Sequence, residues 1–293
     1  MLLPRPWLRL DLALRIAPLL LALAASSAGA QESRILLVGD SWVDQAFAAG
    51  AFDIALQNEG LGQFSSEGAV TAIGGTTAAQ WATAPFLALI DGELATHPTI
   101  DIVHLSVGGN DFLGAPPGTD IVALAVQILD DIDTIVAHIH GIDPSIKVVI
   151  ANYDYVPASF NAELAVITQL MIDQASVTPN AFALNYMGVL HHAFGYPGEF
   201  AAGATPLPGG YPSYIPLQGG DPAFPGHPDF FDDAIHPNDP SYVRLAEHAV
   251  DEFYAQFLDP PPVPALPGEA HAALTLALGC VGALRARRAA SER

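Results

Sequence analysis

The chain has 293 residues, of which 51% are hydrophobic and 14% charged, so it holds ample apolar material for a buried core. Its 31 acidic residues outnumber its 10 Lys and Arg, which gives a formal net charge of -21 at pH 7. This balance argues against binding to nucleic acid or to an anionic membrane surface, because both require basic patches. The single cysteine, Cys280, excludes an internal disulfide and any metal site built from several cysteines.

Residues 1–30 have the pattern of a secretory signal peptide. Three arginines, Arg5, Arg9 and Arg15, are followed by an apolar run from Ile16 to Ala25 and by the small residues Ala28-Gly29-Ala30. The apolar run is shorter than the ~20 residues that span a bilayer. We therefore expect an exported protein whose mature chain begins at Gln31; the alternative is a buried N-terminal helix.

From Arg34 onward, short apolar runs alternate with longer helical patterns. The predicted strands are 35–38, 69–73, 102–107, 148–151 and 181–184, and the predicted helices lie near 43–58, 77–96, 120–140 and 160–177. This alternation predicts an α/β fold with a mostly parallel five-stranded sheet and helices on both faces. Such sheets bind ligands at the carboxyl ends of their strands.

Glycines and polar residues follow the first three predicted strands, as Gly39-Asp40-Ser41, Gly74-Gly75-Thr76-Thr77 and Gly108-Gly109-Asn110-Asp111. A serine where a strand turns into a helix holds its hydroxyl near helix N–H groups, which can bind an oxyanion. Asn110 adds a carboxamide donor. The alternatives are a helix cap at Ser41 and simple tight turns at the glycines. Phosphate binding is disfavoured, since neither G-x-x-x-x-G-K-[ST] nor G-x-G-x-x-G is present.

A fourth motif, Asp233-Ala234-Ile235-His236-Pro237, precedes a final predicted helix that Asp239 would cap, with Pro240 at its first position. A carboxylate three residues before an imidazole can accept the Nδ1–H of the ring. Nε2 is then free to take a proton from a serine. Asp232 is an alternative carboxylate at a spacing of four, and the spacing favours Asp233.

The four motifs together resemble those of the SGNH (GDSL) hydrolase family, in the same order, over about residues 34–258. The resemblance implies a flavodoxin-like three-layer α/β/α sandwich that hydrolyses carboxylic esters or thioesters without a metal or other cofactor. It places the nucleophile on Ser41, the base on His236 and the supporting carboxylate on Asp233. Its oxyanion hole would use Ser41, Gly75 and Asn110, with Gly74 as a near alternative to Gly75.

The C-terminal end has three parts. Five prolines, at 260, 261, 262, 264 and 267, form an extended linker, and a mostly apolar run, 272–284, is followed by Arg285, Arg287 and Arg288. This order resembles the PEP-CTERM type of sorting tail, although Val263-Pro264-Ala265-Leu266-Pro267 replaces its Pro-Glu-Pro. The sequence therefore predicts a signal peptide at 1–30, a hydrolase domain at 31–259 and a sorting or anchor tail at 260–293. The alternative for the tail is an amphipathic helix.

Other features are tied less directly to chemistry. His191-His192 is interpreted as a surface pair rather than a metal site, and Asp130, Asp131 and Asp133 as a solvated helix face, with surface calcium as the alternative. Trp42 and Trp81 either line the mouth of the site or pack against the sheet. The aromatic, Gly- and Pro-rich segment 186–231 is predicted to form a wall or lid over the site.

The sequence therefore predicts an exported serine esterase whose substrate is a small-molecule, lipid or acylated-sugar ester. One alternative is a carbohydrate O-acetyl esterase that uses the aromatic segment as a sugar platform. Another is a surface binding protein that has this fold and little activity. The tail is the candidate for anchoring to a membrane or to the cell surface.

Overall fold

The structure is a computed structural model that describes residues 31–157, 161–194 and 228–258. The predicted signal peptide, the predicted tail and residues 195–227 of the aromatic segment lie outside the described residues. The sheet has the order β2-β1-β3-β4-β5, with β1 (Glu32–Gly39), β2 (Phe64–Glu67), β3 (Ile102–Ser106), β4 (Lys147–Ala151) and β5 (Ala181–Leu184). All neighbouring pairs are parallel. The predicted α/β class is therefore confirmed, and the strand order is that of flavodoxin-like folds.

Residues 35–38 of β1 are buried on both faces of the sheet because this part of the strand is apolar without interruption. Ile35 and Leu37 point into one hydrophobic cluster, and Leu36 and Val38 point into the other. Successive side chains of a strand face opposite ways, so one continuous apolar run supplies both clusters. Such runs are typical of parallel sheets that have helices on both faces.

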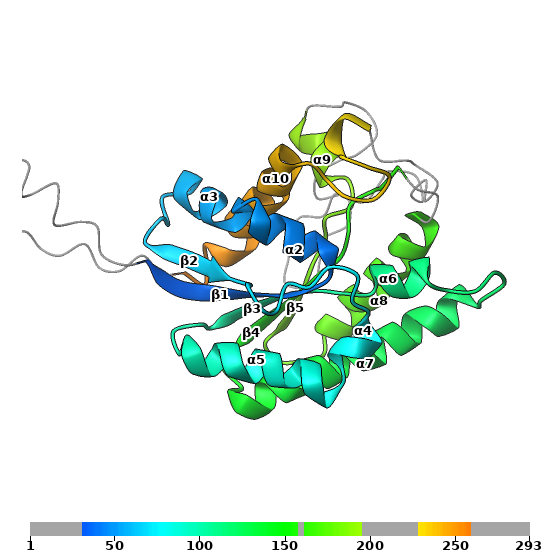
Figure 1. Ribbon diagram of the computed structural model, residues 1–293, viewed down its shortest axis with the longest axis horizontal. Helices are drawn as coiled ribbons and strands as arrows, with labels where there is room; N and C mark the ends of the chain where they lie inside the picture. The colour runs from blue at the N-terminus through cyan, green and yellow to red at the C-terminus, as the bar shows by residue number, and fades with distance from the viewer. Residues whose placement is uncertain (1–30, 158–160, 195–227, 259–293) are drawn as a thin grey trace, which may run out of the picture. The chain divides into compact units, whose positions relative to one another are not determined.

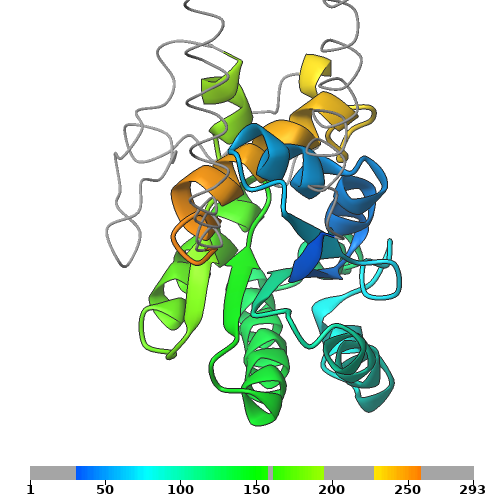
Figure 2. The ribbon, with the colours of Figure 1, turned by 90° about the vertical axis from the view of Figure 1, so that its left-hand side faces the viewer.

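Helices cover both faces of this sheet (Figures 1 and 2). One face carries α2 (Ser41–Ala48), α3 (Ala51–Asn58) and α10 (Asp239–Ala249), and the other carries α4 (Ala78–Trp81), α5 (Ala84–Thr96), α6 (Gly109–Leu113), α7 (Ile121–Ile142) and α8 (Asn161–Ala175). The short helices α9 (Val189–Ala193) and η1 (Pro228–Phe230) precede α10, and η2 (Val250–Tyr254) follows it. No helix within the described ranges is both long and apolar enough to cross a membrane.

The predicted strand at 69–73 is wrong. The edge strand is β2, whose sequence Phe-Ser-Ser-Glu contains no apolar run. Pairing with β1, and not an apolar pattern of its own, orders this strand. The apolar run that follows forms a turn instead, and within it Ala72 makes an isolated parallel bridge to Gly39. The hydroxyl of Thr71 also donates to the carbonyl of Leu37, at 2.7 Å. The run thus extends the sheet edge toward the carboxyl end of β1.

Two predicted helices are each divided in two. The helix predicted at 43–58 breaks at Gly50, whose φ of 62° separates α2 from α3. The helix predicted at 77–96 breaks after α4, and α5 begins again at Ala84 with Pro85 in its first turn. Apolar residues occur on both sides of each break, so hydrophobicity alone does not locate the breaks.

The predicted cap of the last helix, Asp239, is also wrong. Asn238 caps α10, because its side chain accepts the backbone N–H of Ser241 at 3.1 Å. The Asn238 amide also donates to the carbonyl of Asp229, at 2.9 Å. This residue therefore fixes both the start of α10 and the path of the loop that carries His236.

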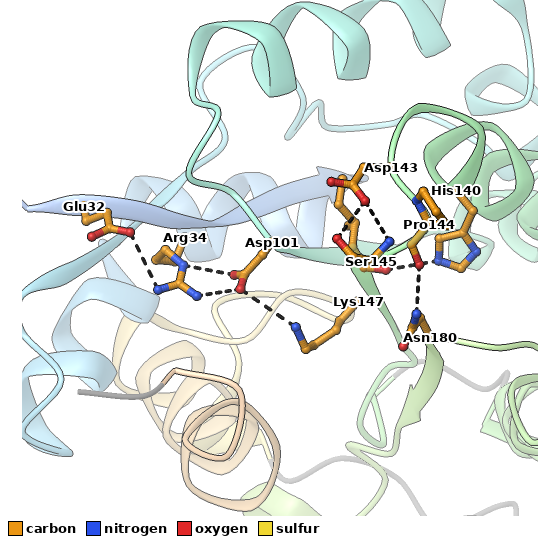
Figure 3. A network of polar contacts seen from close by, with 10 residues as sticks. Glu32, Arg34, Asp101, His140, Asp143, Pro144, Ser145, Lys147 and Asn180 are labelled. Atoms are coloured by element: carbon orange, nitrogen blue, oxygen red, sulfur yellow. Dashed lines mark hydrogen bonds and ion pairs between the residues drawn. The ribbon is translucent and has the colours of Figure 1, made fainter. Parts of the chain in front are cut away.

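A polar network crosses the amino ends of the strands (Figure 3). Arg34 contacts Asp101 at 2.5 Å and Glu32 at 3.6 Å, and Lys147 contacts Asp101 at 3.8 Å. Because the strands are parallel, this network lies at the opposite edge of the sheet from the carboxyl ends that follow β1 and β3.

Candidate active site

Strand β1 ends at a turn that requires glycine. Gly39 has a φ of 145°, and a Cβ there would collide with the carbonyl oxygen of Ser106 at the end of β3. The backbone N–H of Asp40 donates to that same carbonyl, at 3.0 Å. The ends of β1 and β3 therefore lie in contact, at the point where the strand order reverses, and Ser41 begins α2 there.

Three predicted residues come together at this edge. Ser41 Oγ lies 2.8 Å from His236 Nε2, and His236 Nδ1 lies 2.8 Å from Asp233 Oδ2. If Nδ1 carries the proton that Asp233 accepts, Nε2 is the acceptor for the Ser41 hydroxyl. Such a chain can withdraw the hydroxyl proton and make Ser41 a nucleophile.

The Asp233 carboxylate is oriented by its own loop. Its Oδ1 accepts the backbone N–H of Ile235 and of His236, both at 2.7 Å. Partial burial raises the pKa of Asp233, but the hydrogen bonds from the His236 ring and from these two N–H groups outweigh it and lower the pKa below its ordinary value. The alternative carboxylate, Asp232, lies at the same loop and donates its backbone N–H to the carbonyl of His236, at 2.9 Å.

Asn110 stands beside Ser41 at the end of the neighbouring strand. It lies in the first turn of α6, after Gly108, whose φ is 113°. Its Nδ2 donates to the carbonyl of Thr76, at 2.9 Å. A carboxamide has two N–H hydrogens, so this bond fixes the side chain and leaves one hydrogen for a further acceptor.

The two glycines of the second motif have different surroundings. A Cβ on Gly74 would lie 3.8 Å from Ser41 Cβ, whereas a Cβ on Gly75 would meet nothing within 4 Å. Gly75 has a φ of 79° and is followed by Thr76, the acceptor of the Asn110 amide. The side-chain direction of Gly74 thus faces Ser41, and Gly75 is joined through Thr76 to Asn110.

A small pocket adjoins Ser41. Its lining residues come from the ends of β1, β3 and β4 and from the loop before α10: Asp40, Ser41, Trp42, Gly109, Asn110, Leu113, Tyr153, Val156 and Ile235. Apolar side chains form one part of the wall, while Ser41 and Asn110 supply polar atoms. Pockets that mix an apolar wall with a few convergent polar groups are typical of small-molecule sites.

The two tryptophans have different roles. Trp42 lines the pocket and is also buried against the sheet. Trp81 is fully buried, and its Nε1 donates to the hydroxyl of Thr76, at 2.9 Å. At the described ends of the aromatic segment, Phe194 and Phe230 stack with ring centroids 4.7 Å apart.

Sequence reasoning missed Tyr153, which carries no motif. It follows β4, and its hydroxyl lies between the turn at Ser41 and the start of α6: it donates to Asp40 Oδ2, at 2.5 Å, and accepts the backbone N–H of Gly109, at 2.9 Å. Its position just after β4 could have indicated it, since residues that follow a parallel strand lie at the carboxyl ends of the strands, where ligands bind.

Within the described ranges, one group of three side chains could hold a metal: Glu67, Glu93 and His97, whose ligand atoms lie within 4.8 Å of one another. The two ring nitrogens of His97 lie 3.7 Å from different carboxylates, Nδ1 from Glu67 and Nε2 from Glu93. These residues do not line the pocket at Ser41.

The side chains of His191 and His192 lie outside the described part of the structure. Asp130 and Asp133 are exposed and Asp131 is half-buried, all on α7.

No protein-family model and no curated protein matches this sequence. Similar solved structures include a gut microbial diltiazem-metabolizing enzyme, 11% identical with a TM-score of 0.50, over 76% of this chain and 47% of that one. A family 3 carbohydrate esterase from Talaromyces cellulolyticus is 15% identical over 78% of this chain and 98% of that one, with a TM-score of 0.49. A member of the lipolytic protein G-D-S-L family from Veillonella parvula is 16% identical over 76% and 98%, with a TM-score of 0.45. At these identities the comparison concerns the fold alone.

Proposed function

We propose that the protein is a serine esterase of the SGNH (GDSL) type that hydrolyses carboxylic esters through an acyl-enzyme. The observation that carries this proposal is the chain of two 2.8 Å contacts from Ser41 Oγ through His236 to Asp233. Its position at the carboxyl edge of the sheet, beside a small pocket, supports the same conclusion.

The reaction follows from these contacts. Ser41 Oγ attacks the acyl carbon while His236 Nε2 takes the hydroxyl proton, and Asp233 stabilises the imidazolium that forms. His236 then gives this proton to the leaving alcohol, which departs and leaves the acyl group on Ser41. Water attacks the acyl carbon in the second half and loses a proton to His236. His236 gives that proton to Ser41 Oγ as the bond between Oγ and the acyl carbon breaks, so the acid is released and Ser41 is regenerated.

The tetrahedral intermediates carry a negative oxygen that needs donors. The proposed donors are the backbone N–H of Ser41 at the start of α2, the side chain of Asn110 and the backbone N–H of Gly75, with Gly74 as the alternative. Removing one donor of this kind typically lowers kcat by about 10²–10³-fold.

The pocket wall suggests the substrate. Trp42, Leu113, Val156 and Ile235 present apolar surface beside Ser41, so the proposed substrate is an ester whose acyl group is apolar. We also propose that the protein is exported and that its C-terminal segment anchors it to a membrane or to the cell surface, on the sequence features of residues 1–30 and 260–293 alone.

The test is hydrolysis of p-nitrophenyl acetate, butyrate, octanoate and palmitate by the full chain, with Ser41→Ala alongside and acetylated xylan as a further substrate. Turnover that Ser41→Ala abolishes is expected, and the preferred chain length measures the acyl pocket. Activity on acetylated xylan alone would identify a carbohydrate O-acetyl esterase. A folded protein that is inactive on every substrate would favour a binding protein on this fold.

A further inference from the structure

We propose that Tyr153 is a positioning residue of this site, whose hydroxyl ties the turn that carries Ser41 to the helix that carries Asn110. The inference rests on the proposed function, because it concerns the relative placement of a nucleophile and an oxyanion donor. It adds a residue that none of the four motifs contains.

The contacts of the Tyr153 hydroxyl carry this inference. It donates to Asp40 Oδ2, at 2.5 Å, and accepts the backbone N–H of Gly109, at 2.9 Å. Asp40 precedes Ser41, and its Oδ1 caps α2 by accepting the N–H of Trp42 at 3.1 Å. Gly109 precedes Asn110. One hydroxyl thus joins the residue before the proposed nucleophile to the residue before the proposed oxyanion donor.

Packing holds the Tyr153 ring in one place. The ring meets Trp42 edge to face, with centroids 5.2 Å apart and planes at 87°. A Cβ at Gly109 would lie 3.0 Å from Tyr153 Cζ, which is tighter than an ordinary van der Waals contact, so glycine leaves room for the ring. Tyr153 and Asp40 are 4% and 1% exposed. A buried ring with two hydrogen bonds is a rigid spacer between two strand ends.

The electrostatic surroundings make the link sensitive to pH. Burial raises the pKa of Asp40 to about 7, against the opposing effects of the hydrogen bonds from Tyr153 and Trp42 and of the nearby His236, while Asp111 of α6 raises it further. Tyr242 of α10 also faces this carboxyl. Burial raises the pKa of Tyr153 well above its ordinary value, so its hydroxyl stays protonated as the donor. A hydrogen bond to an ionised carboxylate is stronger than one to a neutral acid, so the link tightens as Asp40 ionises.

Tyr153→Phe removes the hydroxyl and keeps the ring. The expected result is a kcat lower by about ten- to a hundredfold with KM changed by less than about twofold, because the reacting groups are misplaced while the pocket wall remains. Any step in the kcat profile that follows the ionisation of Asp40 should also move to higher pH, since Asp40 loses a donor that favours its ionised form. A merely structural role would lower kcat equally at every pH.

Tyr254→Phe is the matched control. Its hydroxyl is also buried and makes a 2.5 Å hydrogen bond, to His104 Nδ1, but Tyr254 does not line the pocket at Ser41. This variant should lose stability while keeping the wild-type kcat and the wild-type pH profile.

Asp40→Asn provides a second, isosteric variant if Tyr153→Phe does not fold. It should lower kcat as well, and in the double variant the two losses should not multiply, because Tyr153 acts partly through Asp40. A wild-type kcat and pH profile in Tyr153→Phe, or losses that multiply fully, would overturn the inference.

Ser41→Ala separates failure of the proposed function from failure of the inference about Tyr153. Activity that survives in Ser41→Ala overturns the proposed function. Ser41-dependent activity that Tyr153→Phe does not affect overturns only the role of Tyr153.

Discussion

Two polar side chains at the site, Asp233 and Asn110, are each held by contacts in addition to those proposed for catalysis. The Asp233 carboxylate binds two N–H groups of its loop in addition to His236, and the Asn110 amide binds Thr76 in addition to facing the pocket. Groups held in this way need little reorganisation when charge develops in a transition state. The residues therefore act as a preset arrangement, and single substitutions should lower kcat more than they raise KM.

Asn110→Ala tests this at one donor. We expect kcat to fall by about 10²–10³-fold with little change in KM, because the lost hydrogen bond is made mainly to the oxyanion. Initial rates on the best p-nitrophenyl ester measure it. Asn58→Ala removes another carboxamide, bonded to Glu247 at 2.6 Å, and should leave kcat unchanged. Equal kcat values in Asn110→Ala and the wild type would remove Asn110 from the oxyanion hole.

A buried carboxyl after β4 makes stability depend on pH. Asp154 accepts the backbone N–H of Tyr155, Gly188 and Leu190, at 2.6–2.8 Å, yet burial outweighs these bonds and raises its pKa from 3.8 to about 7. Between these values the folded chain keeps a proton that the unfolded chain has released. The stability from this group is therefore complete below the ordinary pKa and is lost as the pH rises through about 7.

Asp154→Asn removes this titration. Its free energy of unfolding should depend less on pH than that of the wild type, as measured by urea denaturation at about pH 5, 6.5 and 8. The variant should also be less stable overall, because an amide group replaces one acceptor. An identical pH dependence in Asp154→Asn would contradict the assignment.

At the scale of elements, the short loop between His236 and α10 determines where the imidazole lies. Asn238 caps α10 and at the same time donates to the carbonyl of Asp229. Its backbone N–H donates to the carbonyl of Phe230, at 2.9 Å. The start of α10 and the turn of η1 are therefore joined two residues after His236.

Asn238→Ala should lower the free energy of unfolding by about 1 kcal/mol, the usual effect of losing an N-cap. Asn238→Ser keeps an oxygen for the cap while losing the bond to Asp229, so its stability should lie closer to that of the wild type. Thermal or urea denaturation measures both. Equal stability of the Ala and Ser variants would show that the cap contributes nothing.

The helices and strands that the sequence predicts correctly are those whose local apolar pattern or motif is enough to identify them. Strand β1 and helix α7 carry uninterrupted or periodic apolar residues, and Ser41, Asn110 and His236 stand in recognisable motifs. By contrast, β2 is ordered by pairing with β1, and the helix break at Gly50 depends on a positive φ that the helical period does not show. Tyr153 was missed because its role depends on two partners distant in sequence, Asp40 and Gly109.

At the scale of the whole molecule, acidic side chains dominate the described part of the chain. The basic residues within it are Arg34, Lys147 and Arg244, and each contacts a carboxylate: Arg34 and Lys147 at Asp101, and Arg244 at Glu247. The many other carboxylates there repel one another through solvent. Such self-repulsion lowers the stability of a compact state and is screened by salt.

We therefore expect Tm to rise as NaCl increases from about 0.05 to 0.5 M, because the Debye length falls below the spacing of most surface charges. Differential scanning calorimetry measures the shift, and a neutral osmolyte of equal osmolarity is the control. A Tm that falls with salt would mean that the ion pairs at the amino ends of the strands outweigh the repulsion.

The most direct test of the central claim is covalent labelling of the full chain with a fluorophosphonate, followed by peptide mass mapping. Attack by an activated serine forms an Oγ–P bond and expels fluoride, so we expect one label per chain, located on Ser41. His236→Ala should slow this labelling strongly, and Ser41→Ala should abolish it. A folded protein that takes no label, or a label on another residue, would contradict the proposed nucleophile.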